Sequence, residues 1–204
     1  MVNAVILNMT GIVLSGGENR RMGRDKAFLT LDSVPLIEHV LRTFRGIFPK
    51  TIIVTNTPSA YAIYDTVVVT DVVDKRGPLT GIYTGLLHST DEHNFVVACD
   101  MPFLNPGLIS YMAGLVQGYD IVVPKVAGRV EPLHAIYSKG LLPLIERRLH
   151  QDARQIQGIF NEARVLYVTE PEIVRYDPEK RSLKNLNTPE EYKEAACLDL
   201  ECRS

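Results

Sequence analysis

The residues best suited to chemistry stand together near the start of the sequence, at residues 14–26, LSGGENRRMGRDK. Two adjacent glycines allow backbone N–H groups to approach a ligand closely. Four cations follow, namely Arg20, Arg21, Arg24 and Lys26. A triphosphate needs several amides and cations at once, and cations at a helix start oppose its dipole unless an anion lies between them. The pattern favours a phosphate site over a solvated basic surface.

Two familiar nucleotide loops are excluded by spacing. A P-loop ends in Gly-Lys-Ser or Gly-Lys-Thr, whereas Gly23 is followed by Arg24 and Asp25. A dinucleotide fingerprint reads Gly-x-Gly-x-x-Gly, but here Gly16 and Gly17 are adjacent and no glycine stands two positions later. The loop therefore belongs to another class of phosphate-binding turn.

Composition predicts one globular domain. The chain has 204 residues, of which 46% are hydrophobic and 23% charged. We expect a single domain over residues 1–204, with its core at about 11–194 and terminal extensions at 1–10 and 195–204. The net charge of −2 gives no field of one sign, which argues against nucleic acid and membrane surfaces as partners.

Cysteine content and hydropathy indicate the compartment. Cys99, Cys197 and Cys202 are an odd number without metal-ligand spacing, as in a reduced cytoplasmic chain, although Cys197 and Cys202 remain a conceivable pair. No apolar run reaches the roughly 18 residues that a membrane span requires. Cys99 ends an apolar run and is expected to serve packing rather than nucleophilic attack.

The sequence predicts an alternation of strands and helices, and these elements must position the residues of the glycine loop. Apolar runs predict strands at residues 12–15, 51–56, 65–71, 94–100, 119–125 and 164–169. Helical spacing and caps predict helices that begin at Pro35, at 79–89, at 105–116, at 141–149, at 153–161 and from Pro189. Strands separated by helices imply βαβ units, an α/β fold and a mostly parallel sheet.

Open α/β sheets bind ligands at the carboxyl ends of their strands. Three features fall there: the glycine loop, Asp71 after the run VVVT, and Asp100 after FVVAC. Aspartate at a strand end also commonly caps the next helix, so for each aspartate the sequence leaves both roles open.

Four motifs in order carry a family resemblance. LSGGENRRMGRDK resembles the signature of the molybdenum cofactor guanylyltransferases, LAGGxxxRMGxDK, with Ser15 in place of the usual alanine. DKRGPLTG at 74–81 is similar to the family's RGPLAG, CDMP at 99–102 to CDxP, and NLNTPEE at 185–191 to NxNTPE. The resemblance covers residues 11–194 approximately and implies a Rossmann-like three-layer α/β/α fold.

The resemblance implies a role for each matching position. Leu14, Ser15 and Gly16 would present backbone groups to guanine, and Gly17 would allow the chain to pass the phosphates. Arg21 and Lys26 would hold the β and γ phosphates. Asn56 and Asp71 would complete the nucleoside pocket. Asp100 would bind Mg²⁺, and Asn187 would support the metal. Asp74 would either help at the same place or be exposed to solvent.

The implied reaction is transfer of GMP from GTP to the terminal phosphate of Mo-molybdopterin in the cytoplasm, with pyrophosphate leaving. It needs no general base, because the attacking phosphate is already anionic, so positioning and charge neutralisation would carry catalysis. Transient contact with molybdoenzymes or their chaperones is also implied. Three alternatives stay open: a cytidylyltransferase on the same pterin, a sugar-phosphate nucleotidyltransferase, and a non-catalytic nucleotide-binding protein. Asn185 and Asn187, where the cytidylyltransferases carry aspartate, favour guanine.

The acceptor side of the site is less clearly marked. VAGRVEPLHAIY lies where the family often has a Gln-Pro-Leu element lining the acceptor site, and this chain carries Glu131 in place of glutamine. His134 and Arg154 either contact the pterin or are structural.

Overall fold

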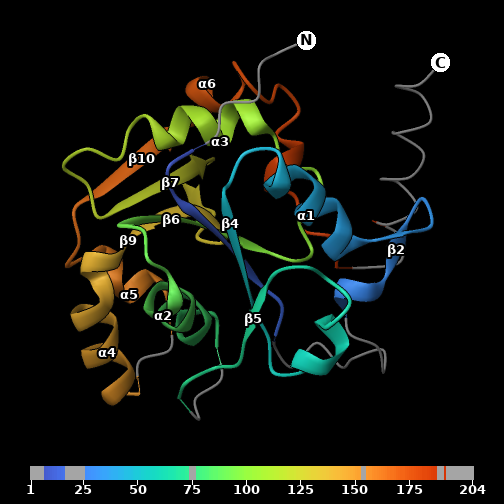
Figure 1. The fold of residues 1–204 in the computed structure, drawn as a ribbon. Helices are drawn as coiled ribbons and strands as arrows, with labels where there is room; N and C mark the ends of the chain where they lie inside the picture. The colour runs from blue at the N-terminus through green and yellow to red at the C-terminus, as the bar shows by residue number, and fades with distance from the viewer. Residues whose placement is uncertain (1–6, 17–25, 74–76, 153–154, 188–190, 192–204) are drawn as a thin grey trace.

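The computed structural model describes residues 7–16, 26–73, 77–152, 155–187 and 191. Within them the main sheet has eight strands in the order β10-β7-β9-β6-β1-β4-β5, with β8 paired to β7 (Figure 1). The strands are β1 (Thr10–Leu14), β4 (Lys50–Val54), β5 (Val67–Val69), β6 (His93–Ala98), β7 (Ile121–Val126), β8 (Arg129–Val130), β9 (His134–Ser138) and β10 (Val165–Thr169).

The predicted mostly parallel sheet is confirmed, with one reversed strand inside it. β1 pairs in parallel with both β4 and β6, β4 with β5, and β10 with β7. β9 lies antiparallel between β6 and β7, and β8 turns back on β7. The strand order reverses at β1, which has β4 on one side and β6 on the other, and open α/β sheets bind ligands at such a point.

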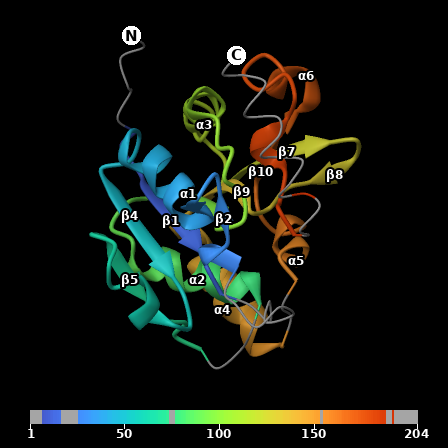
Figure 2. The same cartoon turned by 90° about the vertical axis from the view of Figure 1, so that its right-hand side faces the viewer.

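Helices cover both faces of the sheet, so the expected three layers are present (Figures 1 and 2). Alternate residues of β1 divide the core: Val13 joins the cluster with α1, α3 and α6, while Ile12 and Leu14 join the cluster with α2, α4 and α5. The helices are α1 (Leu36–Arg45), α2 (Pro78–His88), α3 (Pro106–Ala113), α4 (Leu142–His150), α5 (Gln157–Phe160) and α6 (Glu170–Ile173).

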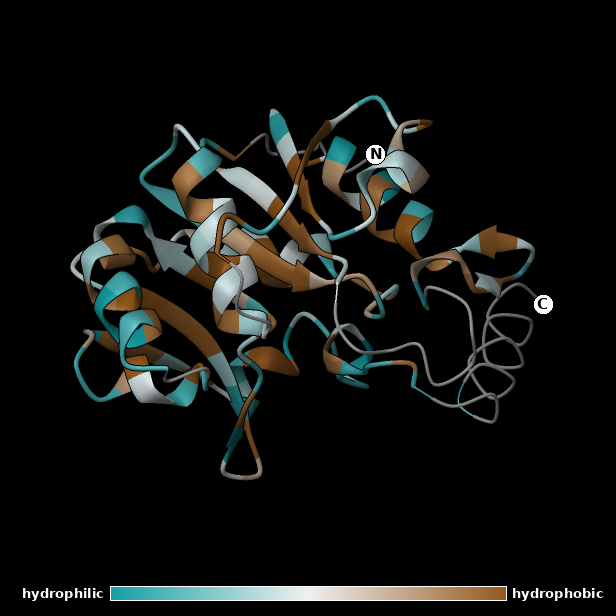
Figure 3. Cartoon of the chain, turned by 90° about the horizontal axis from the view of Figure 1, so that it is seen from below, coloured by the Kyte–Doolittle hydropathy of each residue, from teal (hydrophilic) through white to brown (hydrophobic). Residues whose placement is uncertain are grey.

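The hydropathy of the chain follows these layers. Figure 3 shows apolar stretches along strands of the sheet and alternating polar and apolar stretches along the helices. In α1 the buried residues Ile37, Val40 and Phe44 recur at helical spacing, as the sequence predicts. Phe44 and Phe48 then pack edge to face at 4.7 Å between ring centroids.

The predicted start of α1 is wrong by one residue. Pro35 is the N-cap rather than the first helical residue, because it pairs with Thr30 in a hairpin of β2 (Thr30–Leu31) and β3 (Val34–Pro35). The hairpin turn consists of Asp32 and Ser33 at φ 50° and 63°, as two-residue turns require. The sequence carries no glycine there, so the hairpin was not predicted.

Other boundaries differ for local reasons. The predicted cap of α3 is confirmed, since the Asn105 side chain accepts a hydrogen bond from the N–H of Leu108, but the helix ends at Ala113 with Gly114 as C-cap. α5 spans four residues of the predicted 153–161, of which 153–154 lie outside the described residues. α6 was not predicted, although Thr169 and Glu172 form a capping box. The helix expected from Pro189 also lies outside the described part, apart from residue 191.

Candidate functional site

The turn after β1 is fixed between its two neighbouring strands. The carbonyl of Leu14 accepts a hydrogen bond from the N–H of Cys99 at 3.0 Å, and the N–H of Ser15 donates to the carbonyl of Val54 at 2.8 Å. The predicted loop therefore starts at the carboxyl edge of the sheet, at the reversal of strand order. Gly17 and Arg21, two further predicted site residues, lie outside the described residues.

Three elements converge beside this turn. A Cβ on Gly16 would lie 3.5 Å from Nδ2 of Asn56, which follows β4. That amide donates to Oδ2 of Asp71 at 3.3 Å, and the hydroxyl of Thr84 in α2 donates to Oδ1 at 3.4 Å. Burial raises the pKa of Asp71, while the bonds from Asn56 and Thr84 act in the opposite direction. The two predicted nucleoside residues are thus brought into contact.

The RGPLTG motif positions α2 against the turn. Gly77 has φ 146°, a conformation that L side chains rarely adopt, and Pro78 occupies the first helical turn. A Cβ on Gly81 would lie 3.2 Å from Cδ2 of Leu14, so the missing side chain allows the helix to approach β1. The N-terminus of an eleven-residue helix, with its positive dipole end, therefore lies at the carboxyl edge.

Lys26, Asp100 and Asn187 form a second group. The ammonium of Lys26 donates to Oδ1 of Asn187 at 2.8 Å and lies 3.9 Å from Oδ2 of Asp100. The N–H of Leu186 donates to the carbonyl of Asp100 at 2.9 Å, which brings the NLNTPEE segment onto the end of β6. Three sequence motifs separated by more than 70 residues each meet around one cation.

The environment of the Asp100 carboxylate is suited to binding a cation. Burial raises the pKa of Asp100, the nearby Lys26 ammonium and a backbone N–H lower it, and the Glu191 carboxylate raises it. The side chains of Lys26 and Asp100 are 19% and 14% exposed, so their attraction is only partly screened. A carboxylate oxygen beside an amide oxygen suits Mg²⁺, which takes hard oxygen ligands.

A metal at this position would depend mostly on substrate oxygens. Among the residues that the structure describes, no three His, Cys, Asp or Glu side chains lie close enough together to hold a metal ion. Mg²⁺ is commonly bound by one or two carboxylates together with phosphates, so Asp100 with a bound nucleotide would satisfy it.

An open cavity of about 340 Å³ lies beside Glu131. It lies between the β7–β8 hairpin and residues 179–184, and its charged lining residues are Arg129, Glu131, Glu179, Lys180 and Lys184. Oε1 of Glu131 accepts the N–H of Leu133 at 3.3 Å. Burial raises the pKa of Glu131, the hydrogen bond from the N–H of Leu133 lowers it, and the negative charge of Asp100 raises it.

His134 does not reach this cavity. It is fully buried in β9 and packs edge to face on Phe95 with centroids 5.0 Å apart. Burial lowers the pKa of His134 to about 3, and neither ring nitrogen has a hydrogen-bond partner among the described residues. The structural role is therefore the correct one of the two that the sequence left open, and Cys99 likewise lies in the core. Arg154 and Asp74 fall outside the described residues.

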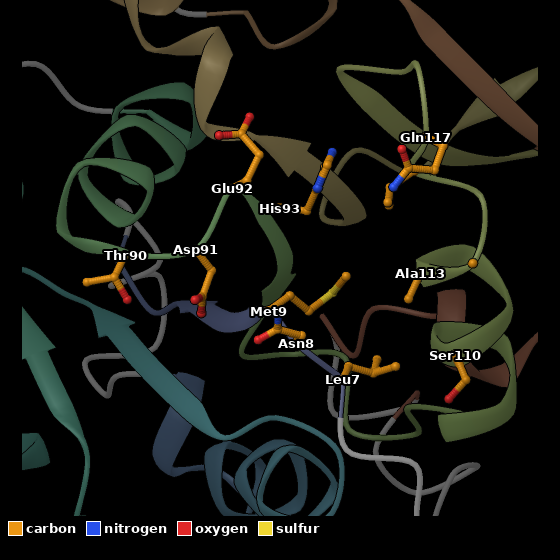
Figure 4. A pocket seen from close by; sticks show the side chains of 12 residues that line it. Leu7, Asn8, Met9, Thr90, Asp91, Glu92, His93, Ser110, Ala113 and Gln117 are labelled. Atoms are coloured by element: carbon orange, nitrogen blue, oxygen red, sulfur yellow. The ribbon is translucent and has the colours of Figure 1, made fainter.

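A second open cavity lies at the opposite edge of the sheet. It measures about 570 Å³ and is lined by Leu7, Asn8 and Met9 before β1, by residues 90–93 before β6, and by the end of α3 (Figure 4). Its carboxylates already have partners, because Asp91 accepts the hydroxyl of Thr10 and Glu92 that of Ser138. None of the predicted site residues lines it.

Sequence reasoning missed several residues that contact the site. Thr84 carries no signal beyond being a polar residue in an apolar helix, and Tyr61, whose hydroxyl lies 2.5 Å from Oγ of Ser15, carries none at all. Glu191 stands inside the NLNTPEE motif, and its carboxylate accepts the N–H of Asn187 at 2.5 Å. The contacts of Thr84 and Tyr61 join residues 13 and 46 positions apart, which no local pattern reveals, whereas Glu191 bonds a residue four positions away. The described helices include none that is long and apolar enough to cross a bilayer.

Comparisons with known proteins agree with this geometry. Residues 11–165 match the MobA-like NTP transferase domain. The chain is 40% identical over 189 residues to the molybdenum cofactor guanylyltransferase of Desulfosudis oleivorans, covering 92% of this chain and 94% of that protein. It is 37% identical to the probable molybdenum cofactor guanylyltransferase of Natranaerobius thermophilus, covering 92% and 95%.

A solved structure is also similar over nearly the whole chain. The crystal structure of molybdopterin-guanine dinucleotide biosynthesis protein A from Archaeoglobus fulgidus superposes with a TM-score of 0.84 at 29% identity, covering 95% of this chain and all of that one. The expected family is confirmed by the matched domain, the identities and the shared fold together. The chain belongs to the MobA-like NTP transferase family and is a relative of its molybdenum cofactor guanylyltransferases.

Proposed function

We propose that this protein transfers GMP from GTP to the terminal phosphate of Mo-molybdopterin, producing molybdopterin guanine dinucleotide and pyrophosphate. The observation that carries the proposal is the convergence of Lys26, Asp100 and Asn187 next to the glycine turn and the Asn56–Asp71 pair. The names of the relatives supply the substrates: guanylyl transfer and molybdenum cofactor.

In the proposed step an oxygen of the acceptor phosphate attacks the α-phosphorus of GTP. The bond between the α-phosphorus and the bridging oxygen breaks, and that oxygen leaves on pyrophosphate with the electron pair. Backbone groups of Leu14, Ser15 and Gly16, with Asn56 and Asp71, hold the nucleoside. Gly17 gives the phosphates room, and Arg21 and Lys26 neutralise the leaving pyrophosphate, as preorganised cations do in phosphoryl transfer.

Asp100 is the proposed carboxylate ligand of Mg²⁺, supported by Asn187. A bound Mg²⁺ supplies charge neutralisation on the nucleotide phosphates. The chain's own contribution is a largely buried carboxylate, whose pKa is raised mainly by burial. Burial leaves this carboxylate in need of a positive charge nearby. Lys26 partly meets that need through its 3.9 Å approach.

We assign the acceptor to the cavity beside Glu131. Its volume of about 340 Å³ suits a small heterocycle, and Arg129 and Lys184 offer positive charge without an ion pair among the described residues. A pterin presents two adjacent N–H donors on its aminopyrimidinone edge, which a carboxylate accepts in pairs. This accounts for Glu131 next to an otherwise anionic substrate. We expect the reaction to occur in the cytoplasm, with transient contact to molybdoenzymes or their chaperones.

The test is calorimetry with GTP, CTP and ATP in the presence of Mg²⁺, followed by a pyrophosphate-release assay with Mo-molybdopterin. We expect GTP to bind most tightly and to release pyrophosphate only when the acceptor is present. Tighter binding of CTP would favour the cytidylyltransferase instead. GTP binding without pyrophosphate release, in an assay where a known guanylyltransferase is active, would favour a non-catalytic binder.

A further inference from the structure

One fully buried tyrosine contacts both ends of the glycine loop. Tyr61 ends the short 3₁₀ helix η3 (Pro58–Tyr61), between β4 and β5, and its side chain is inaccessible to solvent. Neither the motifs nor the proposed chemistry assigns it a role. Its hydroxyl lies 2.5 Å from Oγ of Ser15, which is itself only 1% exposed.

The ring of Tyr61 reaches the other end of the same loop. It packs on Phe28 with ring centroids 5.0 Å apart and an interplanar angle of 47°. Phe28 is the last residue of the 3₁₀ helix η2 (Lys26–Phe28), which begins with the phosphate lysine. Ser15 precedes the glycine pair and Lys26 closes the loop, so one side chain contacts the residues on both sides of it.

The segment that carries Tyr61 also carries part of the nucleoside pocket. Val54 accepts the N–H of Ser15, and Asn56 lies against Gly16. Five residues later Tyr61 reaches the Ser15 side chain. A shift of this segment would therefore move Asn56, the turn after β1 and the lysine end of the loop together.

We propose that Tyr61 is a positioning residue, which sets the spacing between the Ser15–Gly16 turn and Lys26 through its hydroxyl and its ring. It acts through Ser15 and Phe28 and does not touch substrate. The role depends on the proposed function, because the loop must bind a nucleoside triphosphate for the spacing to matter. The serine that replaces the usual alanine of the signature is the residue whose hydroxyl makes this contact.

The hydrogen bond can be removed in two ways that differ in stability. Tyr61→Phe keeps the ring on Phe28 but leaves the buried Ser15 hydroxyl without its partner, which is destabilising. Adding Ser15→Ala removes that unpaired hydroxyl, so the double variant should regain thermal stability relative to Tyr61→Phe. Positioning, in contrast, is not regained, because the link between segment and loop is still missing.

The experiment compares melting temperature, the KM for GTP and kcat in wild type, Tyr61→Phe, Ser15→Ala and the double variant. We expect the double variant to melt close to wild type while its KM for GTP stays about tenfold higher, because the free energy of that bond no longer holds the turn in its binding geometry. The matched control is Tyr64→Phe, which removes a phenol three residues away that makes no hydrogen bond among the described residues. Its KM should equal that of wild type.

Two other results would overturn the proposal. A KM that recovers together with stability in the double variant would mean that the bond serves folding alone. Unchanged KM in every variant would exclude any role in positioning. If wild type itself fails to bind GTP, the proposed function fails instead, and the same variants measured with the nucleotide that does bind test Tyr61 separately.

Discussion

At the scale of single residues, Lys26 occupies an unusual position between the two oxygen groups assigned to a metal. Its ammonium bonds the Asn187 amide at 2.8 Å and approaches the Asp100 carboxylate at 3.9 Å. One cation therefore contacts both oxygens. Binding of a triphosphate with its cation would replace these contacts by stronger ones.

Lys26→Ala and Asp100→Ala should each lower kcat by roughly 10² to 10³, by analogy with loss of one preorganised charge-stabilising donor. Lys50→Ala is the matched control, since Lys50 is 55% exposed and pairs with Asp91 at the opposite edge of the sheet. Steady-state pyrophosphate release measures the effect. Near-normal turnover of either site variant would remove that residue from the mechanism.

Glu131→Gln should raise the KM for the pterin acceptor by about tenfold and leave the KM for GTP unchanged. The reason is that an amide offers one acceptor oxygen where the carboxylate offers two, and hydrogen bonds to charged groups are the stronger ones. Glu179→Gln, in the same cavity lining but exposed, is the control. Equal acceptor KM values in wild type and Glu131→Gln would show that the pterin lies elsewhere.

His134 makes stability depend on pH. Its pKa is about 3 in the folded chain and 6.5 in the reference state, so between these values the unfolded chain binds a proton that the folded chain excludes. The neutral imidazole therefore costs no stability above pH 6.5. Below that pH the free energy of unfolding falls by about 1.4 kcal/mol per pH unit because of this group. Urea midpoints at pH 6.5, 5.5 and 4.5 should fall less steeply for His134→Leu than for wild type. Parallel declines would contradict the burial of a neutral imidazole.

At the scale of elements, close packing of α2 on β1 fixes the site. A Cβ on Gly85 would lie 2.6 Å from Cγ2 of Ile12, closer than real Cβ atoms come. Gly85→Ala should therefore destabilise the protein by about 1 to 3 kcal/mol, as overpacking does, despite the better helix propensity of alanine. Gly46→Ala is the control, because its Cβ would meet only a carbonyl at 3.4 Å. Chemical denaturation measures both, and equal stabilities would contradict the tight helix–strand contact.

The elements also show what sequence reasoning can reach. The helices Leu36–Arg45 and Pro78–His88 were predicted with starts one residue away from those observed. In the first the buried residues recur at helical spacing, and in the second most residues are buried. The β2–β3 hairpin was missed because its turn uses Asp32 and Ser33 at positive φ without glycine. The motifs located Lys26, Asp100 and Asn187, but the contact of Tyr61 with Ser15 depends on tertiary packing that no local pattern encodes.

At the scale of the whole molecule, both core clusters share the central strands. β1 and β4 each contribute alternate residues to the cluster on either face. We propose on this ground that the chain is one domain, with a core at about 11–194 and extensions at 1–10 and 195–204. Urea unfolding followed by far-UV and near-UV circular dichroism should give coincident transitions. Two separated transitions would indicate independent units.

The antiparallel strand β9 separates two parts of the sheet edge, and the strands of these two parts are connected in different ways. The nucleotide side is built from turns whose strands must return by crossover helices, so a change of length there disturbs a whole βαβ unit. The Glu131 side is built from the β7–β8 hairpin and the short return to β9, a connection that lengthens without moving any helix. We therefore expect that grafting residues 127–133 changes the preference for the proposed acceptor and leaves the residues proposed to bind the triphosphate unchanged.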